Sequence, residues 1–165
     1  MKTKPGVIIV MGVAGAGKTT IGSLLAHELG WDFYDADDFH SESNRKKMSQ
    51  NIALTDEDRA DWLTSLRNLI DQNIQPGRSI VLACSALKNS YRTTLMIHEQ
   101  VKFFYLNGTY EQIESRLHQR TDHFMSAKML SSHFDILEEP QDTLTIDISH
   151  TPQEIISIIR KGLSL

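Results

Sequence analysis

The most informative segment of the chain is Gly12-Val13-Ala14-Gly15-Ala16-Gly17-Lys18-Thr19. It matches the pattern G-x-x-x-x-G-K-[ST], a loop (the P-loop) whose backbone N–H groups surround a phosphate. A β-branched run at residues 7–11 precedes the loop, and apolar residues at helical spacing continue from it to residue 29. This context favours a nucleotide-phosphate site over a glycine-rich turn that happens to contain a lysine.

The P-loop also predicts roles for individual side chains. Lys18 reaches the β- and γ-phosphates of a nucleotide, which makes it a predicted catalytic residue, and the Thr19 hydroxyl binds Mg²⁺. The predicted nucleotide site extends to Thr20, because the N-terminus of the following helix attracts anions.

The rest of the chain alternates between strand and helix patterns. Buried-strand patterns occur at 7–11, 32–35, 80–84, 101–106 and 143–148. Helical patterns occur at 18–29, 55–70, 91–98, from 109 and from 151, and the last two begin, like 55–70, at a threonine that caps a helix. Such alternation predicts an α/β P-loop NTPase fold, with a five-stranded parallel sheet and helices on both faces. We expect one domain over residues 1–165, without repeats or linkers.

Composition excludes several classes of protein. The 165 residues carry 17 Lys+Arg against 21 Asp+Glu and include no basic block, which argues against nucleic-acid binding. No apolar run of about 18 residues is present, so we expect no membrane span. The single cysteine, Cys84, rules out an intramolecular disulfide and fits a reducing compartment, so the sequence predicts a cytoplasmic protein.

An acidic turn, Asp35-Ala36-Asp37-Asp38-Phe39-His40, follows the second strand. Asp37 or Asp38 could cap a helix there, or the carboxylates could orient Mg²⁺ waters and accept a proton from a substrate hydroxyl. The P-loop favours the functional interpretation, with Asp37 as catalytic base. Since no aspartate ends the third strand, Asp35 is the expected assistant to Thr19 at Mg²⁺.

Further motifs come in a characteristic order along the chain. They are Lys47-Met48, Leu54-Thr55-Asp56-Glu57-Asp58-Arg59, Trp62-Leu63, Ala83-Cys84-Ser85-Ala86-Leu87-Lys88, Tyr91-Arg92, Arg116-Leu117 with Arg120, and His123-Phe124-Met125. With the P-loop and the acidic turn, they closely resemble the gluconokinase family over essentially the whole chain. The resemblance implies ATP-dependent phosphorylation of D-gluconate at its 6-hydroxyl. It also implies a shikimate-kinase-like P-loop domain with a short mobile lid near 119–130, and a homodimer.

The resemblance further implies roles for charged residues. Substrate binding falls to Asp37, His40, Arg59, Lys88, Arg92 and His123. Nucleotide binding includes Arg116 and Arg120, and Arg120 is also a predicted catalytic residue that neutralises charge on the γ-phosphoryl group.

For several of these residues an alternative stays open. Arg59, the expected clamp on the gluconate carboxylate, could instead pair with Asp56 or Glu57, and Arg92 could pair with a surface acid. Arg116 and Arg120 could form a solvated helix face. Because Arg59 lies in the first turn of its helix, the helix dipole predicts that its replacement is neutral or slightly stabilising.

The sequence departs from the family pattern at Ser41, Ala53, Asp61, Asp122 and His133. These changes concern loop rigidity more than charge. Two rival functions stay open, another small-molecule kinase of the same fold and a catalytically silent ATP-binding sensor.

Overall fold

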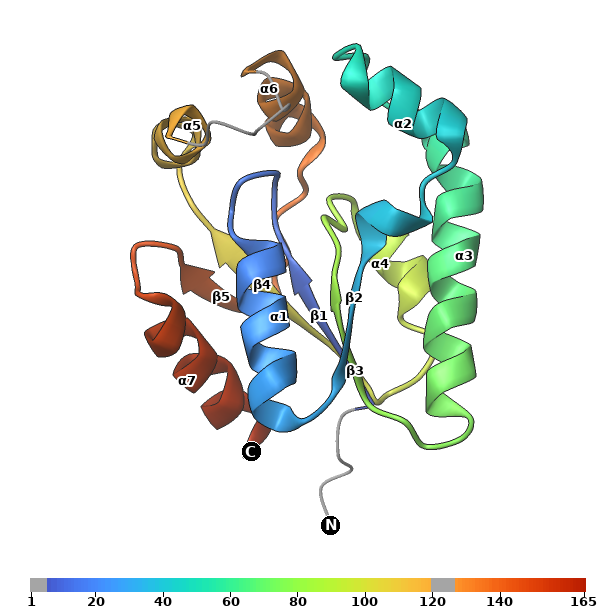
Figure 1. Cartoon of the computed structure of the whole chain (residues 1–165), viewed down its shortest axis with the longest axis vertical. Helices are drawn as coiled ribbons and strands as arrows, with labels where there is room; N and C mark the ends of the chain where they lie inside the picture. Colours follow the sequence, from blue (N-terminus) through green and yellow to red (C-terminus); the bar gives the residue numbers. More distant parts are fainter. Residues whose placement is uncertain (1–5, 120–126) are drawn as a thin grey trace.

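The computed structural model describes residues 6–119 and 127–165. The strands are β1 (Val7–Met11), β2 (Asp32–Asp35), β3 (Ile80–Ala83), β4 (Val101–Asn107) and β5 (Leu144–Asp147). The helices are α1 (Lys18–Leu29), the 3₁₀ helix η1 (Ala36–Phe39), α2 (Glu42–Ser49), α3 (Asp56–Ile74), α4 (Asn89–Leu95), α5 (Tyr110–His118), α6 (Ala127–Ile136) and α7 (Pro152–Leu163). The strands form one parallel sheet in the order β2-β3-β1-β4-β5, which confirms the predicted α/β fold (Figure 1).

Strand β1 separates two hydrophobic cores, because successive side chains of a strand point to opposite faces of the sheet. Ile8 and Val10 belong to one core, and Val7, Ile9 and Met11 belong to the other. Helices α1 and α7 cover the first face, and α3 and α4 cover the second (Figure 1). Covering both faces explains why β1 is apolar throughout.

The register of the strands brings their carboxyl ends to one edge of the sheet. Asp35 at the end of β2 pairs with Ala83 at the end of β3, and Ala83 pairs with Val10 of β1. Beyond this edge lie the P-loop, α2, α5 and α6 (Figure 1). Residues that follow β1, β2 and β3 are therefore close together, as ligand binding in such folds requires.

The predicted helix starts are confirmed where the signal is local. Thr55, Thr109 and Thr151 each accept a backbone N–H three residues ahead, and the side chain at that position bonds back to the threonine N–H. Gly30 ends α1 in the left-handed conformation. Capping needs only neighbouring residues, so the sequence alone suffices to place these ends.

Two helices, α2 and α6, were not predicted, and α4 ends at Leu95 rather than at residue 98. The strands 80–84 and 143–148 are each shorter than predicted. Most of the predicted lid near 119–130 lies outside the described residues, and its last four residues begin α6.

Candidate active site

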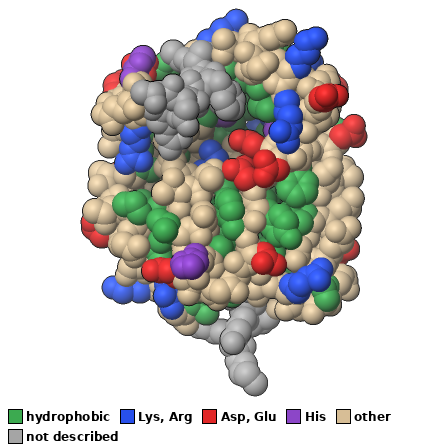
Figure 2. Space-filling view, in the orientation of Figure 1, with side chains coloured by type: hydrophobic (Ala, Val, Ile, Leu, Met, Phe, Trp, Pro, Cys, Tyr) green, Lys and Arg blue, Asp and Glu red, His purple; other side chains and the backbone are tan. Residues whose placement is uncertain are grey.

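A pocket of about 610 Å³ lies beyond the carboxyl ends of β1, β2 and β3. Ten residues with a predicted role line it: Ala14, Gly15, Gly17, Lys18, Thr19, Thr20, Asp35, Asp37, His40 and Arg59. Figure 2 shows acidic side chains at the edge of a hollow at this end of the molecule, with Lys or Arg side chains beside them. The fold thus brings the phosphate loop and the acidic turn into one cavity.

Two glycines give the P-loop its shape. Gly15 has a φ of +82°, and a Cβ there would lie 2.8 Å from Leu117 Cδ2 of α5. A Cβ on Gly12 would lie 2.9 Å from a backbone carbonyl oxygen of β4. Lys18 Nζ donates to Val13 O at 2.9 Å, so the ammonium group lies against the loop that is suited to surround a phosphate.

The remaining predicted loop residues support the pocket rather than line it. Val13 and Ala16 are buried, and Ala16 N donates to Val13 O at 3.2 Å. With Gly12, they hold the loop against the sheet below the lining residues.

Thr19 and Asp35, the predicted Mg²⁺ residues, lie side by side. Thr19 Oγ1 donates to Asp35 Oδ2 at 2.8 Å. Mg²⁺ prefers such hard oxygen ligands, and in phosphoryl-transfer sites it takes one or two from the protein and the rest from phosphate and water. Residues 6–119 and 127–165 contain no group of three His, Cys, Asp or Glu side chains that could hold a metal. The pair therefore fits an ion bound largely through the nucleotide.

The turn after β2 places Asp37 in the pocket. Asp35 Oδ1 accepts the Asp37 backbone N–H at 2.9 Å, so the capping role that the sequence allowed for Asp37 or Asp38 falls to Asp35. The Asp37 side chain is exposed to the open pocket, and the protein around the cavity partly desolvates its carboxyl group. This desolvation raises its pKa against the attraction of Lys18, and repulsion from Asp35 and Asp38 raises it further. A raised pKa suits a carboxylate that accepts a proton.

His40 enters the pocket as a neutral ring. It stacks on Trp62 with ring centroids 4.5 Å apart and planes 9° from parallel. Asn44 Nδ2 lies 3.3 Å from His40 Nδ1 and also donates to a backbone carbonyl of α3 at 2.7 Å. Burial, together with the positive charges of Arg59 and Arg45, lowers the His40 pKa to about 4. Its role in binding the substrate stays a prediction.

Arg59 brings a buried guanidinium to the pocket wall. Its Nη1 donates to Leu54 O at 2.8 Å and to the Tyr91 hydroxyl at 3.3 Å, and the Tyr91 hydroxyl donates to Asp56 Oδ1 at 2.6 Å. The described residues include no ion pair of Arg59, so the alternative of pairing with Asp56 or Glu57 finds no support. A buried guanidinium that faces a cavity is suited to a carboxylate ligand.

Lys88 and Arg92 do not line the pocket. Lys88 Nζ binds the Asp56 carboxylate at 2.9 and 3.0 Å. Arg92 is buried and donates to the carbonyl oxygens of Ala86 and Glu138, at 2.6 and 2.7 Å. These contacts favour a structural role for Arg92. Both hydrogen bonds go to backbone carbonyl oxygens, whereas the alternative from the sequence was an ion pair with a surface acid.

Arg116 lies beside the P-loop without lining the pocket. It donates to Ile148 O, and its Nη1 lies 4.0 Å from where a Cβ on Gly17 would be. This position is compatible with the predicted nucleotide contact. The other two predicted residues of this region, Arg120 and His123, lie outside the described residues.

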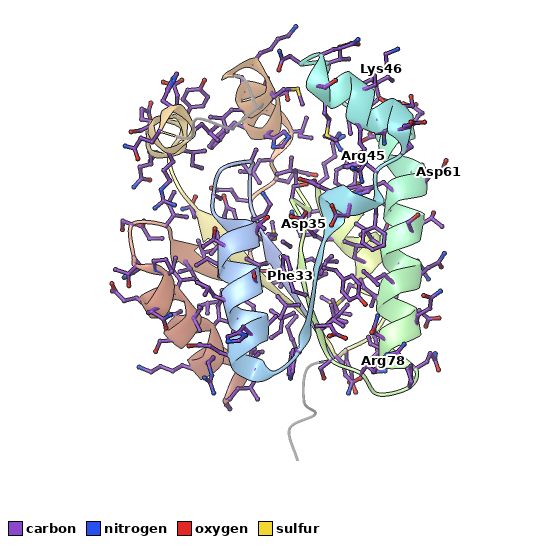
Figure 3. The ribbon with its side chains drawn as sticks, viewed as in Figure 1. Phe33, Asp35, Arg45, Lys46, Asp61 and Arg78 are labelled. Atoms are coloured by element: carbon purple, nitrogen blue, oxygen red, sulfur yellow. The ribbon has the colours of Figure 1, made fainter. Side chains whose placement is uncertain are left out.

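Arg45 and His133 are lining residues to which the sequence analysis assigns no role. Arg45 Nη2 donates to Asp38 O at 2.9 Å, and Figure 3 shows Arg45 on α2 above Asp35 at the end of β2. His133 of α6 accepts the Ala14 backbone N–H on Nδ1 at 3.2 Å. Only weak sequence signals point to either residue, since α2 lacks apolar periodicity and His133 is 119 residues away from Ala14.

Comparisons with known proteins agree with this geometry. A shikimate kinase family model matches residues 14–159. The chain is 42% identical to a probable gluconokinase of Rattus norvegicus, over 96% of this chain and 98% of that protein. It is 41% identical to a gluconokinase of Arabidopsis thaliana, over 93% and 89%. The structure of a gluconokinase from Sinorhizobium meliloti 1021 superposes with a TM-score of 0.89 at 34% identity, covering 99% of this chain and 94% of that one.

Proposed function

The chain belongs to the gluconokinase family, and we propose that it transfers the γ-phosphoryl group of ATP to the 6-hydroxyl of D-gluconate, giving 6-phospho-D-gluconate and ADP. One observation carries the proposal: Lys18, Asp37 and the buried Arg59 line a single pocket. Lys18 suits the phosphates of ATP, Asp37 suits a hydroxyl that loses its proton, and Arg59 suits a carboxylate. A sugar acid with a hydroxyl at its far end offers both of the groups that the last two residues require.

In this mechanism Arg59 binds the carboxylate of gluconate and thereby orients the substrate. Asp37 accepts the proton of the 6-hydroxyl as its oxygen bonds to the γ-phosphorus and the bond from that phosphorus to the leaving ADP oxygen breaks. Its raised pKa makes it a stronger base than an ordinary aspartate. Lys18 stabilises the charge that develops on the phosphoryl oxygens.

Three further residues are proposed to act on the nucleotide. Thr19 and Asp35 would hold Mg²⁺, which neutralises phosphate charge when bound. Arg116 would contact the nucleotide beside Gly17, and the sequence-based roles of Arg120 and His123 remain proposals that rest on the resemblance.

Cytoplasmic location and a homodimer also remain proposals. Burial raises the pKa of the single cysteine, Cys84, to about 12, so this thiol is unreactive, and the proposed location rests on the single-cysteine composition. Among the described residues, no helix is long and apolar enough to cross a membrane. The homodimer rests on the family resemblance.

A coupled assay of ADP release tests the proposed function. Purified protein is given Mg-ATP with D-gluconate, other sugar acids, shikimate or hexoses, one at a time. D-gluconate should raise ADP release far above the ATP-only rate, and shikimate and hexoses should not. Stimulation by shikimate would favour the rival kinase, and no stimulation by any compound would favour the ATP-binding sensor.

A further inference from the structure

His133 joins α6 to the P-loop and at the same time borders the pocket. Its Nδ1 accepts the backbone N–H of Ala14 at 3.2 Å, and both residues line the cavity. The ring is half-buried, because one side opens onto the pocket while protein surrounds the rest. No residue of the described ranges forms a hydrogen bond with its Nε2.

The hydrogen bond to Ala14 fixes the tautomer of the ring. A backbone amide can only donate, so Nδ1 must be unprotonated and the single proton of the neutral imidazole must lie on Nε2. Burial, with the positive charges of Lys18 and Arg59, lowers the His133 pKa to about 3, so the ring stays neutral at physiological pH. His133 therefore offers the pocket one uncharged N–H donor of fixed orientation.

His40 repeats this arrangement from another element. Asn44 Nδ2 also donates to a carbonyl oxygen, which orients the amide, so Asn44 donates to His40 Nδ1 as well and leaves the His40 proton on Nε2. The positive charge of Arg59 lowers the pKa of both histidines, and that of Lys18 also lowers the pKa of His133. Lys18 and Arg59 are each suited to bind an anion, and the neutral N–H donors of the two histidines lie near them. Such donors match the uncharged hydroxyl groups along the carbon chain of a sugar acid.

We propose that His133 is a specificity-determining residue whose Nε2–H donates to a chain hydroxyl of the sugar acid, with its orientation set by the Ala14 N–H. This inference rests on the proposed function, since it takes the acceptor to be a hydroxyl between the carboxylate at Arg59 and the reacting hydroxyl at Asp37.

Two matched substitutions separate the two ring nitrogens. In His133→Asn, the side-chain oxygen stands as many bonds from Cα as Nδ1 does, so it can still accept from Ala14, but the donor is lost. In His133→Gln, the amide nitrogen can take the place of Nε2 and keep the donor, while the acceptor for Ala14 is lost. Steady-state kinetics of both variants and wild type are measured with D-gluconate and with its 2-, 3-, 4- and 5-monodeoxy analogues.

We expect His133→Asn to raise KM for gluconate by roughly 3- to 10-fold, the loss of about one neutral hydrogen bond, with KM for ATP nearly unchanged. In wild type, one deoxy analogue should have a higher KM than gluconate, and we call this difference the deoxy penalty. In His133→Asn the penalty of that analogue should shrink to near zero. The penalty should persist in His133→Gln. If His133 had only a structural role, its substitution would not remove the deoxy penalty at one hydroxyl position alone.

The inference is overturned if every deoxy penalty of wild type persists in His133→Asn, or if His133→Gln loses the same penalty as His133→Asn. If His133→Asn does not fold, His133→Gln decides alone. Loss of a wild-type deoxy penalty in His133→Gln overturns the inference, and persistence of the wild-type penalties supports it. Failure of the proposed function looks different, because wild type would then release no ADP in response to gluconate.

Discussion

Replacing Arg59 with glutamine tests substrate binding and stability together. The helix dipole alone predicts a neutral or slightly stabilising change, because Arg59 lies in the first turn of α3. The structure reverses that expectation. Arg59 is 8% exposed and its Nη1 donates to Leu54 O and to the Tyr91 hydroxyl, so the substitution leaves two buried acceptors without this donor.

The two effects have different sizes. Loss of hydrogen bonds from a buried charged donor costs about 1–3 kcal/mol, and each kcal/mol lowers Tm by about 2–4 °C in a protein of this length. We therefore expect Tm to fall by roughly 2–12 °C. Removing the partner of a desolvated carboxylate costs about 2–5 kcal/mol of binding, and 2 kcal/mol corresponds to a KM about 30-fold higher. KM for gluconate should rise by at least that factor, with KM for ATP nearly unchanged.

The assay compares gluconate with a neutral polyol of the same length, which has no carboxylate. Arg59→Gln should reduce kcat/KM for gluconate much more than for the polyol. Arg67→Gln is the matched control, because Arg67 is an exposed arginine of the same helix whose Nη1 donates to Thr94 O at 3.4 Å, and it should leave Tm and both kcat/KM values nearly unchanged. Equal losses on the two substrates, or an unchanged KM for gluconate in a destabilised protein, would refute the assignment of Arg59 to the carboxylate.

Four further predictions concern Lys18, Asp37 and the ion pair of Lys47 with Asp58. Lys18→Met should lower kcat by at least about 10²-fold with little change in Tm, measured by ADP release and thermal melting, and a large fall in Tm would make Lys18 structural. Asp37→Asn should lower kcat by about 10²–10⁴-fold but raise Tm slightly, because partial desolvation and repulsion from Asp35 and Asp38 disfavour the charged carboxylate at neutral pH. In wild type, kcat/KM should fall with decreasing pH through a pKa above the usual 3.9 of aspartate, and an unshifted acid limb would count against Asp37 as the base. Lys47 holds the pKa of Asp58 at about 2, below its unfolded value, so this contribution to stability is present above about pH 4 and lost toward pH 2. Lys47→Met should flatten the fall of Tm over that interval, and an unchanged slope would contradict it.

The fold could be predicted from sequence where neighbouring residues determine it. Local sequence was sufficient to predict the apolar strand 7–11 and the helix starts at the capping residues Thr55, Thr109 and Thr151. Helix α2 could not be predicted from apolar periodicity, because its residues are almost all polar. It is held by the Ser41 cap and by contacts of its side chains with Asp58 of α3, which the sequence does not reveal.

The candidate site followed the same rule. The P-loop and the acidic turn are contiguous motifs, and most of their predicted residues line the pocket. Arg59 and His133 have partners 32 and 119 residues away, and Arg59 and Arg92 also donate to backbone carbonyls, and no sequence pattern specifies such contacts. For this reason the helix dipole and the buried hydrogen bonds of Arg59 predict opposite signs for the effect of Arg59→Gln on stability, and the sequence analysis assigns no role to His133.

Phosphorus-31 NMR of the reaction product shows which hydroxyl group of gluconate receives the phosphoryl group. The protein is incubated with Mg-ATP and D-gluconate, and the new phosphate monoester signal is recorded without proton decoupling. Transfer to the 6-hydroxyl predicts a triplet, because the phosphorus then couples to the two protons of C6, and its intensity should match the ADP formed. A doublet would place the phosphate on a secondary hydroxyl, and inorganic phosphate alone would show hydrolysis of ATP without transfer, and either result would contradict the proposed reaction.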